Sequence, residues 1–311
     1  MKEVVILMNY DELVSRGNIA YENNEFDVAL THFLKALLIH HDLEVMSKVA
    51  LIYFERKDYV QSFDMFSDIL SMDQTYASGY YGLAINCEEM NKPLEAIEYY
   101  LEAIKYDPEY FTAYFFLANI YGDMHEYEKA KYNYIKAISI EQDFTWAHIN
   151  LGAIYELEQN YDKALEHAQI AYGIDPTIKF VCFNLGVVYS KIGKYDLAKN
   201  YLLEEIEKVD GYIFAYLNLG ILYKDIDRNL ELAKDMYLKG IKKDDSIGSL
   251  WYNLACCEAL LGHNKEAYQN FKRSFECEAS LFTYFLQDSE MDLFKQTEEG
   301  KLIITQTNGM K

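Results

Sequence analysis

Four asparagines recur at one place in a short apolar motif in the second half of the chain. They are Asn150, Asn184, Asn218 and Asn253, in "INLGAIY", "FNLGVVY", "LNLGILY" and "YNLACCE". Asparagine is a mediocre helix former, so helix stability does not explain the recurrence. Its side-chain amide both donates and accepts hydrogen bonds, and it can pair with the backbone N–H and C=O groups of a bound peptide. The chemistry that this pattern predicts is peptide binding.

Aromatic side chains accompany these asparagines. Turned at 100° per residue, the positions four before and one before each asparagine fall on the asparagine's own helix face. The surface that this face predicts is aromatic and uncharged, with one amide per motif. The candidate peptide-binding residues are Asn150, Asn184, Asn218, Asn253, Trp146, Phe180, Phe183, Phe214 and Tyr252.

Residues typical of enzymes show no comparable pattern. The seven histidines are scattered, and no H-E-x-x-H, G-x-S-x-G or glycine-rich phosphate loop occurs. His148 falls on a packing face, which favours a core histidine over a metal ligand. Cys256 falls on the asparagine face, where burial as a small hydrophobic residue is favoured over a role as a reactive thiol. We expect no catalytic activity, no metal and no cofactor.

The elements that position the asparagines follow from a repeat of 34 residues. A leucine, then a small residue, then a tyrosine three positions further on recur at this period, and a second small residue follows nine positions after the tyrosine. The leucines are Leu83, Leu117, Leu151, Leu185 and Leu219, with Leu254 one residue late, and the second small residues are Ala96, Ala130, Ala164 and Ala198. Ala233 comes one position late because "KDIDRNLELA" contains one inserted residue.

This pattern resembles the tetratricopeptide repeat, over residues from about 10 to about 281. The resemblance implies an all-α, right-handed superhelical solenoid of about eight helix-turn-helix repeats, which start near residues 10, 43, 77, 111, 145, 179, 213 and 248. Arg16 and Val49 stand where the leucine belongs, so the first two repeats are degenerate. We expect an N-terminal segment over 1–9, a capping helix over 282–299 and a tail over 300–311.

Helical geometry supports the same fold without the resemblance. Counted from the first residue of each repeat, positions 4, 7, 8 and 11 form one stripe, which faces the second helix of the repeat. The small residue at position 8 lets the two helices approach, and the small residue at position 20 lies where the first helix crosses. No repeat buries its apolar stripe alone, so neighbouring repeats stack and leave a long concave groove.

The asparagines occupy position 6, on the face opposite this stripe. In tetratricopeptide repeats that face lines the concave surface, and similar asparagine ladders line peptide-binding grooves. Adjacent helices pack about 8–10 Å apart and an extended strand advances about 3.3 Å per residue. A bound strand therefore meets an asparagine about every three residues. The alternative is that the asparagines are typical of the family and that the position 2 aromatics are buried between repeats.

The first half of the predicted groove is different. Position 6 there is Ser15, Lys48, Gly82 and Phe116. Tetratricopeptide domains that hold a partner's C-terminal carboxylate use lysine, arginine and asparagine from adjacent repeats. Here Lys48 and Asn18 are isolated in the sequence, so we do not expect a carboxylate clamp.

Charge and composition limit the partners. The formal charge of −21 argues against nucleic acid and anionic membrane surfaces as ligands. The five cysteines have irregular spacing, which favours a reducing compartment, and no run is long enough for a signal peptide or a membrane span. We expect a cytoplasmic, non-enzymatic scaffold that binds a neutral, apolar or basic segment in the groove of repeats 5–8. The alternative is an assembly module that self-associates or docks folded partners through its outer surface or its termini, where "VVILM" (Val4 to Met8) is one candidate.

Overall fold

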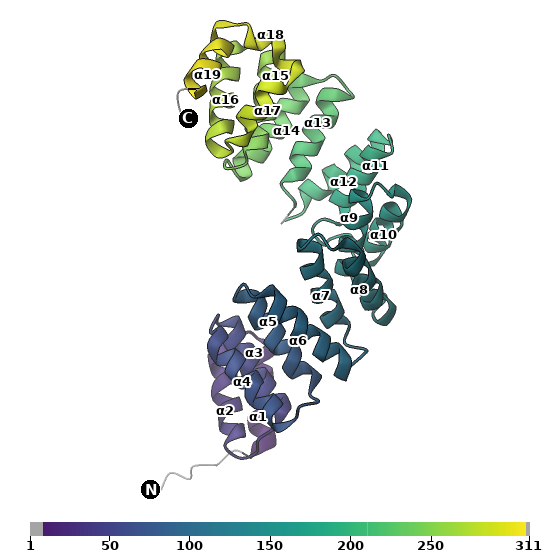
Figure 1. The fold of residues 1–311 in the computed structure, drawn as a ribbon, viewed down its shortest axis with the longest axis vertical. Helices are drawn as coiled ribbons and strands as arrows, with labels where there is room; N and C mark the ends of the chain where they lie inside the picture. Colours follow the sequence, from purple (N-terminus) through teal and green to yellow (C-terminus); the bar gives the residue numbers. More distant parts are fainter. Residues whose placement is uncertain (1–8, 210, 309–311) are drawn as a thin grey trace. The chain divides into compact units, whose positions relative to one another are not determined.

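The structure, a computed structural model, describes residues 9–209 and 211–308. Within these ranges every regular element is a helix, as predicted (Figure 1). Residues 4–8 and 309–311, parts of the predicted N-terminal segment and tail, lie outside the described ranges. The chain divides into two compact units, residues 1–147 and 148–311, which we describe separately. No helix in the described part is long and apolar enough to span a membrane.

Helices up to residue 277 follow one another as first and second helices of consecutive repeats. In the first unit they are α1 (Tyr10–Glu22) and α2 (Phe26–Leu37), α3 (Leu43–Glu55) and α4 (Tyr59–Met72), α5 (Ala77–Glu89) and α6 (Pro93–Tyr106), and α7 (Phe111–Asp123) and α8 (Tyr127–Ile140). They continue with α9 (Thr145–Leu157) and α10 (Tyr161–Ile174), α11 (Val181–Lys191) and α12 (Tyr195–Glu207), α13 (Phe214–Asp225) and α14 (Leu230–Lys243), and α15 (Gly248–Leu260) and α16 (Asn264–Cys277).

The turns between paired helices share one backbone feature. Each contains a residue in the left-handed region, which ends the first helix and reverses the chain. Asparagine and glycine, which tolerate positive φ, supply half of these residues. They are Asn24, Lys57, Asn91, His125, Gln159, Gly193, Arg228 and Gly262. Side-chain caps then start several second helices: Asn160 accepts from the backbone N–H of Lys163, and Asn229 from that of Leu232. Pro93 begins α6, where its missing N–H costs nothing.

The first unit shows why the degenerate repeats still fold. The small residue at position 20 is present in its repeats as Ala29, Ser62, Ala96 and Ala130, all fully buried. Val49, in place of leucine, is also fully buried. Gly17 at position 8 lies directly against the ring of Phe33, which leaves no room for a Cβ atom. The close contact between paired helices is therefore kept although the leucine is lost.

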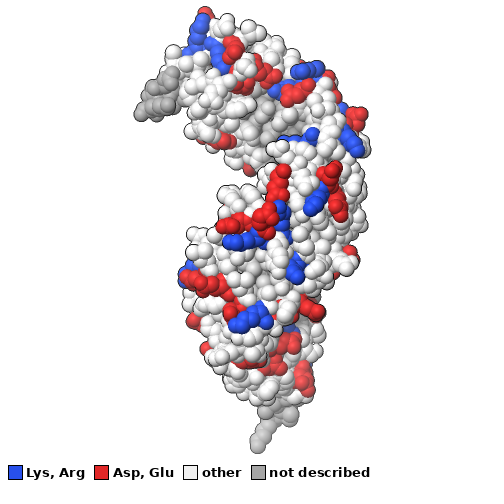
Figure 2. All heavy atoms as spheres, turned by 45° about the vertical axis from the view of Figure 1, so that its right-hand side comes forward, with Lys and Arg blue, Asp and Glu red and all other residues white. Residues whose placement is uncertain are grey.

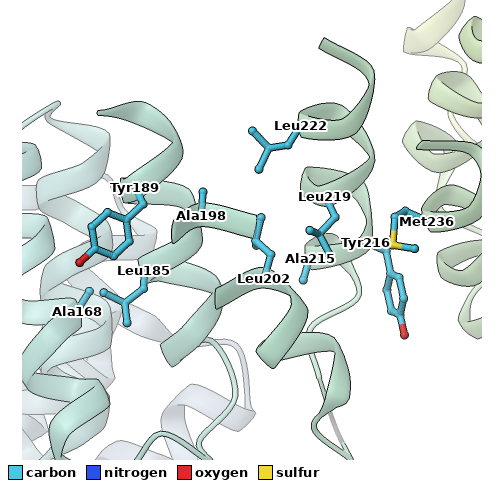
Figure 3. Close-up of a cluster of buried hydrophobic side chains, with 10 residues drawn as sticks. All are labelled: Ala168, Leu185, Tyr189, Ala198, Leu202, Ala215, Tyr216, Leu219, Leu222 and Met236. Atoms are coloured by element: carbon cyan, nitrogen blue, oxygen red, sulfur yellow. The ribbon is translucent and has the colours of Figure 1, made fainter. Parts of the chain in front are cut away.

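In the second unit the predicted packing stripe forms the core. Leu185 and Tyr189 of α11, Ala198 and Leu202 of α12 and Leu219 of α13 pack together in one buried cluster (Figure 3). A Cβ atom on Gly186 would lie 3.3 Å from the backbone oxygen of Ala198, so the small residues at positions 8 and 20 meet as expected.

The C-terminal segment differs from the single capping helix that we predicted over 282–299. It forms α17 (Ser280–Gln287), η1 (Ser289–Met291), α18 (Asp292–Lys295) and α19 (Glu298–Asn308), so that the predicted tail is helical as far as Asn308. Local polar contacts divide the segment: Asp288 accepts from the N–H of Glu290, and Thr297 from that of Gly300. These helices cover the last repeat, because Phe282, Phe285, Met291, Phe294 and Ile303 pack with Phe271 of α16.

Candidate functional site

The candidate residues lie on the first helices α9, α11, α13 and α15, except Phe180, which immediately precedes α11, and their environments differ. Trp146, near the start of α9, is 38% exposed. The four asparagines and Phe180, Phe183 and Phe214 are partly buried. Tyr252 on α15 is buried. The nine residues therefore do not form one uniform exposed surface.

The asparagines make different hydrogen bonds. The side-chain nitrogen of Asn184 donates to the backbone carbonyl of Ile149 at 3.3 Å, from α11 to α9. That of Asn253 donates to the carbonyl of Ser249 in its own helix at 2.9 Å. Within the described residues the side-chain oxygen of Asn184 accepts no hydrogen bond. Asn184 thus joins two repeats and keeps an acceptor that can bind a ligand N–H.

A small pocket of about 220 Å³ lies beside Asn184, between α9 and α11. Its walls come from the predicted groove positions of repeats 5 and 6 and from neighbouring core residues. They are Gly152, Ala153, Glu156, Leu157, Ala164, Phe183, Asn184, Val187 and Val188. Pockets for whole small molecules have volumes of about 300–1,000 Å³. This pocket suits one or two side chains of a peptide.

The charged groups at this pocket are few. Glu156 is 23% exposed and lies 3.9 Å from the ammonium of Lys191. On the face of the molecule drawn in Figure 2, acidic and basic side chains lie in small mixed groups separated by uncharged surface. The pocket itself combines an apolar wall, one amide and one carboxylate.

Three of the candidate aromatic residues converge on a tyrosine that sequence reasoning missed. The ring centroid of Tyr212 lies 4.7 Å from that of Phe180, 4.8 Å from that of Phe183 and 5.2 Å from that of Phe214. We call Phe180, Phe183, Tyr212 and Phe214 the aromatic cluster. Tyr212 is the last residue of repeat 6, outside the first helices, so the helical wheel did not include it. The "GYIF" sequence, with two aromatics, was the available signal.

A buried carboxylate holds the backbone beneath this cluster. Glu205 of α12 is fully buried and accepts from the backbone N–H groups of Phe180 and Tyr212, each at 3.1 Å. The ammonium of Lys208 lies 2.9 Å from the Glu205 carboxylate and also donates to the carbonyl of Ile178. Phe180 has φ = 76°, a conformation that costs a bulky residue about 1–3 kcal/mol. The surrounding hydrogen bonds offset this strain.

Tyr252 corrects the prediction of an open surface on α15, whereas Cys256 is buried, as expected. The Tyr252 hydroxyl donates to the carboxylate of Asp288 at 2.7 Å, and Tyr252 packs against Phe271 and Tyr284. Cys256 is 1% exposed, and burial raises the pKa of its thiol well above the usual value. The C-terminal segment covers both residues, because it buries the apolar face of the last repeat.

An ion pair with a largely buried lysine extends this cover to α13. The ammonium of Lys224 lies 2.6 Å from the carboxylate of Glu290 in η1. Burial opposes the charged form of Lys224, but Glu290 and Asp225 outweigh it and raise the lysine's pKa. The open part of the candidate surface therefore ends before α15.

The structure also tests the predictions for His148 and for Lys48 with Asn18. His148 is a buried core histidine, as expected, and its Nδ1 lies 3.0 Å from Nδ1 of His167. Lys48 and Asn18 are not isolated in the structure: the ammonium of Lys48 donates to the side-chain oxygen of Asn18 at 3.0 Å, because α1 and α3 are first helices of adjacent repeats. Lys48 also pairs with Glu44 on its own helix.

Comparisons with known proteins agree with this architecture. The sequence pattern of the tetratricopeptide repeat matches residues 77–110, 111–144 and 181–206. No curated protein matches the chain in sequence.

Three solved structures share the fold. One is a chain of the APC/C hetero-tetramer Cut9-Hcn1, with 17% identity and a TM-score of 0.63, over 96% of this chain and 55% of that one. Another is pilF of Pseudomonas aeruginosa, with 17% identity and a TM-score of 0.59, over 65% of this chain and 92% of that one. The third is YrrB, described as a tetratricopeptide protein with an unusual peptide-binding site, with 23% identity and a TM-score of 0.50, over 60% of this chain and 95% of that one.

The tetratricopeptide fold supports a role as a protein-interaction scaffold, and proteins with this fold generally bind protein or peptide partners and are not catalytic. Three segments of the chain match the tetratricopeptide repeat, and the helical architecture of the described residues is the tetratricopeptide fold.

Proposed function

We propose that this protein is a non-enzymatic scaffold that binds an extended peptide segment of a partner along α9, α11 and α13. The observation that carries the proposal is the pocket of about 220 Å³ that contains Phe183, Asn184 and Val187. These three residues occupy the predicted groove positions of repeat 6. The surface contributed by repeat 8 is smaller than the sequence indicated, because Tyr252 is covered.

The contacts at the pocket match what a peptide backbone offers. The free acceptor on Asn184 suits a peptide N–H, and one such bond contributes about 0.5–1.5 kcal/mol net. The apolar wall of Phe183 and Val187 suits an uncharged side chain. YrrB, which shares this fold, is described as having an unusual peptide-binding site, and this likeness supports the same class of function here.

A displayed library of random dodecamer peptides tests the proposal without knowledge of the partner. We expect the intact protein to enrich a family of peptides, whose binding is then measured by fluorescence polarisation. Val187→Lys places a charged chain in the pocket and is expected to weaken binding at least about tenfold, which corresponds to about 1.4 kcal/mol. Val209→Lys changes a side chain that is 97% exposed, outside the pocket, and is the matched control. Failure to enrich any peptide, or equal binding by both variants, contradicts the proposal.

A second candidate function is assembly through the outer surface. On the second helices of the first unit, Leu94, Leu101 and Ile135 are all exposed. Exposed apolar side chains on neighbouring helices favour contact with another protein surface. Light scattering separates the candidates: a stable oligomer that Leu101→Lys and Ile135→Lys dissociate supports assembly, whereas a monomer at all concentrations contradicts self-association.

A further inference from the structure

One position of the repeat carries a residue that the packing does not explain. Position 27, near the end of each second helix, is buried in every repeat. In six repeats it is alanine, serine or glycine, in repeat 2 it is isoleucine, and in repeat 6 it is Glu205. The residues other than Glu205 are Ala36, Ile69, Ala103, Ala137, Ala171, Gly240 (after the one-residue insertion) and Ser274.

A carboxylate at this position is costly. A charge removed from water destabilises the fold by several kcal/mol unless it is paired and hydrogen-bonded. Lys208 and two backbone N–H groups pair with Glu205. Such a pair is often no more stabilising than apolar residues in its place, whereas six repeats fold here with a small residue. Stability alone therefore does not account for Glu205.

The carboxylate is hydrogen-bonded to two loops, each of which precedes a first helix. Where position 27 is Ala103 or Ala137, the next first helix starts at position 1, with Phe111 or Thr145. After Glu205, α13 starts at position 2, with Phe214. The helix α11, which follows Ala171, starts at position 3, with Val181, and the residue before it is bonded to Glu205. The freed backbone N–H groups of Phe180 and Tyr212 both donate to Oε1 of Glu205. Gly211 passes so close to the backbone oxygen of Glu205 that a Cβ atom does not fit.

We propose that Glu205 is a positioning residue for partner recognition, which sets Phe180 and Tyr212 beside Phe183 so that the aromatic cluster receives a bulky apolar side chain of the bound peptide. The inference deepens the proposed function and rests on it. Phe183 belongs both to this cluster and to the wall of the 220 Å³ pocket, so the two features form one continuous surface.

The local charges select an uncharged side chain. The ammonium of Lys179 lies 5.2 Å from the ring centroid of Phe180 and 5.6 Å from that of Tyr212. It occupies the cation–π position on these rings and repels a lysine or arginine of the ligand. Glu156 at the pocket disfavours a carboxylate. An aromatic or long aliphatic side chain fits both environments.

Three variants of Glu205 and its neighbour test the inference with a peptide enriched by the wild-type protein. Glu205→Ala introduces the residue that four repeats have at this position, but it removes the partner of Lys208 and the acceptor of two backbone N–H groups. We therefore expect a lower melting temperature, and binding is measured well below it. Peptide binding is expected to weaken at least about tenfold, as for loss of one anchoring contact. Glu205→Gln keeps an oxygen that accepts from both N–H groups and is expected to bind within about threefold of wild type. Glu207→Ala, at an exposed residue two positions away, is the matched control.

The outcomes separate this inference from the proposed function. If the library enriches no peptide, the proposed function fails. If it enriches peptides that Glu205→Ala binds as well as the wild type does, the proposed function stands and the role of Glu205 is overturned. A peptide consensus without a bulky apolar residue also overturns it.

A loss of folding in Glu205→Ala does not leave the question open. In that case Tyr212→Ala, which leaves the carboxylate in place, decides. At least about tenfold weaker binding, together with an apolar consensus, supports the role of the cluster. Unchanged binding overturns it.

Discussion

The side-chain nitrogen of Asn184 and the backbone oxygen of Ile149 lie 3.3 Å apart and join α11 to α9. The donor belongs to one repeat and the acceptor to the repeat before it. The four asparagines occupy equivalent positions in the sequence, but their hydrogen-bond partners are not all equivalent. Asn253 bonds to its own helix instead, at the carbonyl of Ser249.

Asn184 and Asn218 are expected to respond differently to replacement by alanine. Asn184→Ala removes the hydrogen bond between repeats and is expected to cost about 0.5–1.5 kcal/mol in the free energy of unfolding. The side chain of Asn218 makes no hydrogen bond within the described residues, and alanine is the better helix former, so Asn218→Ala is expected to be neutral or slightly stabilising. Denaturant unfolding followed by circular dichroism measures both. Equal destabilisation by the two variants contradicts this assignment.

Two glycines at the same repeat position provide a matched pair. A Cβ atom on Gly186 would lie 2.6 Å from Cγ of Leu202, whereas on Gly152 the nearest atoms are at 3.5 Å. Gly186→Ala is expected to destabilise by about 1–3 kcal/mol through overpacking. Gly152→Ala is expected to stabilise by about 0.5–1 kcal/mol, because alanine favours the helix. Thermal unfolding of each variant checks the sign, and a stabilised Gly186→Ala variant shows that Leu202 moves aside.

The C-terminal helices are expected to stabilise the last repeat. Phe285 is fully buried, with its ring centroid 4.8 Å from that of Phe271. Phe285→Ala is expected to cost about 3–5 kcal/mol and to expose apolar surface that binds a hydrophobic dye. Leu293, on the same segment, is 81% exposed, and Leu293→Ala is expected to change stability by less than about 0.5 kcal/mol. A similar loss in both variants argues against a packed cap.

The histidine pair of α9 and α10 predicts a loss of stability in acid. Burial, and next the neighbouring His148, hold the pKa of His167 below its usual value of 6.5, while Glu166 acts in the opposite direction. The unfolded chain therefore binds the proton more readily, so the free energy of unfolding is expected to fall as pH drops through about 6.5.

Melting curves between about pH 5 and pH 8 measure this dependence. His167→Gln is expected to flatten it, whereas His41→Gln, at an exposed histidine of the first unit, is expected to leave it unchanged. An identical slope in wild type and His167→Gln contradicts the assignment.

Much of the fold followed from spacing alone. Leucine and small residues at a 34-residue period define the faces on which paired helices meet, and Gly186 lies against Ala198 as that period requires. Burial of His148 was also predictable from its place on the helical wheel. These features depend on neighbours within one repeat, where helical geometry fixes which residues face each other.

The sequence by itself determined the repeated helix pairs, their packing faces and the face that carries the asparagines, because each depends on the local period of apolar residues. The tertiary structure decided which of those residues meet. Glu205 brings Tyr212 to Phe180, and Asp288 reaches Tyr252 from 36 residues further along the chain. Contacts of this kind depend on how separate repeats and the terminal helices fold onto one another, which no local periodicity encodes.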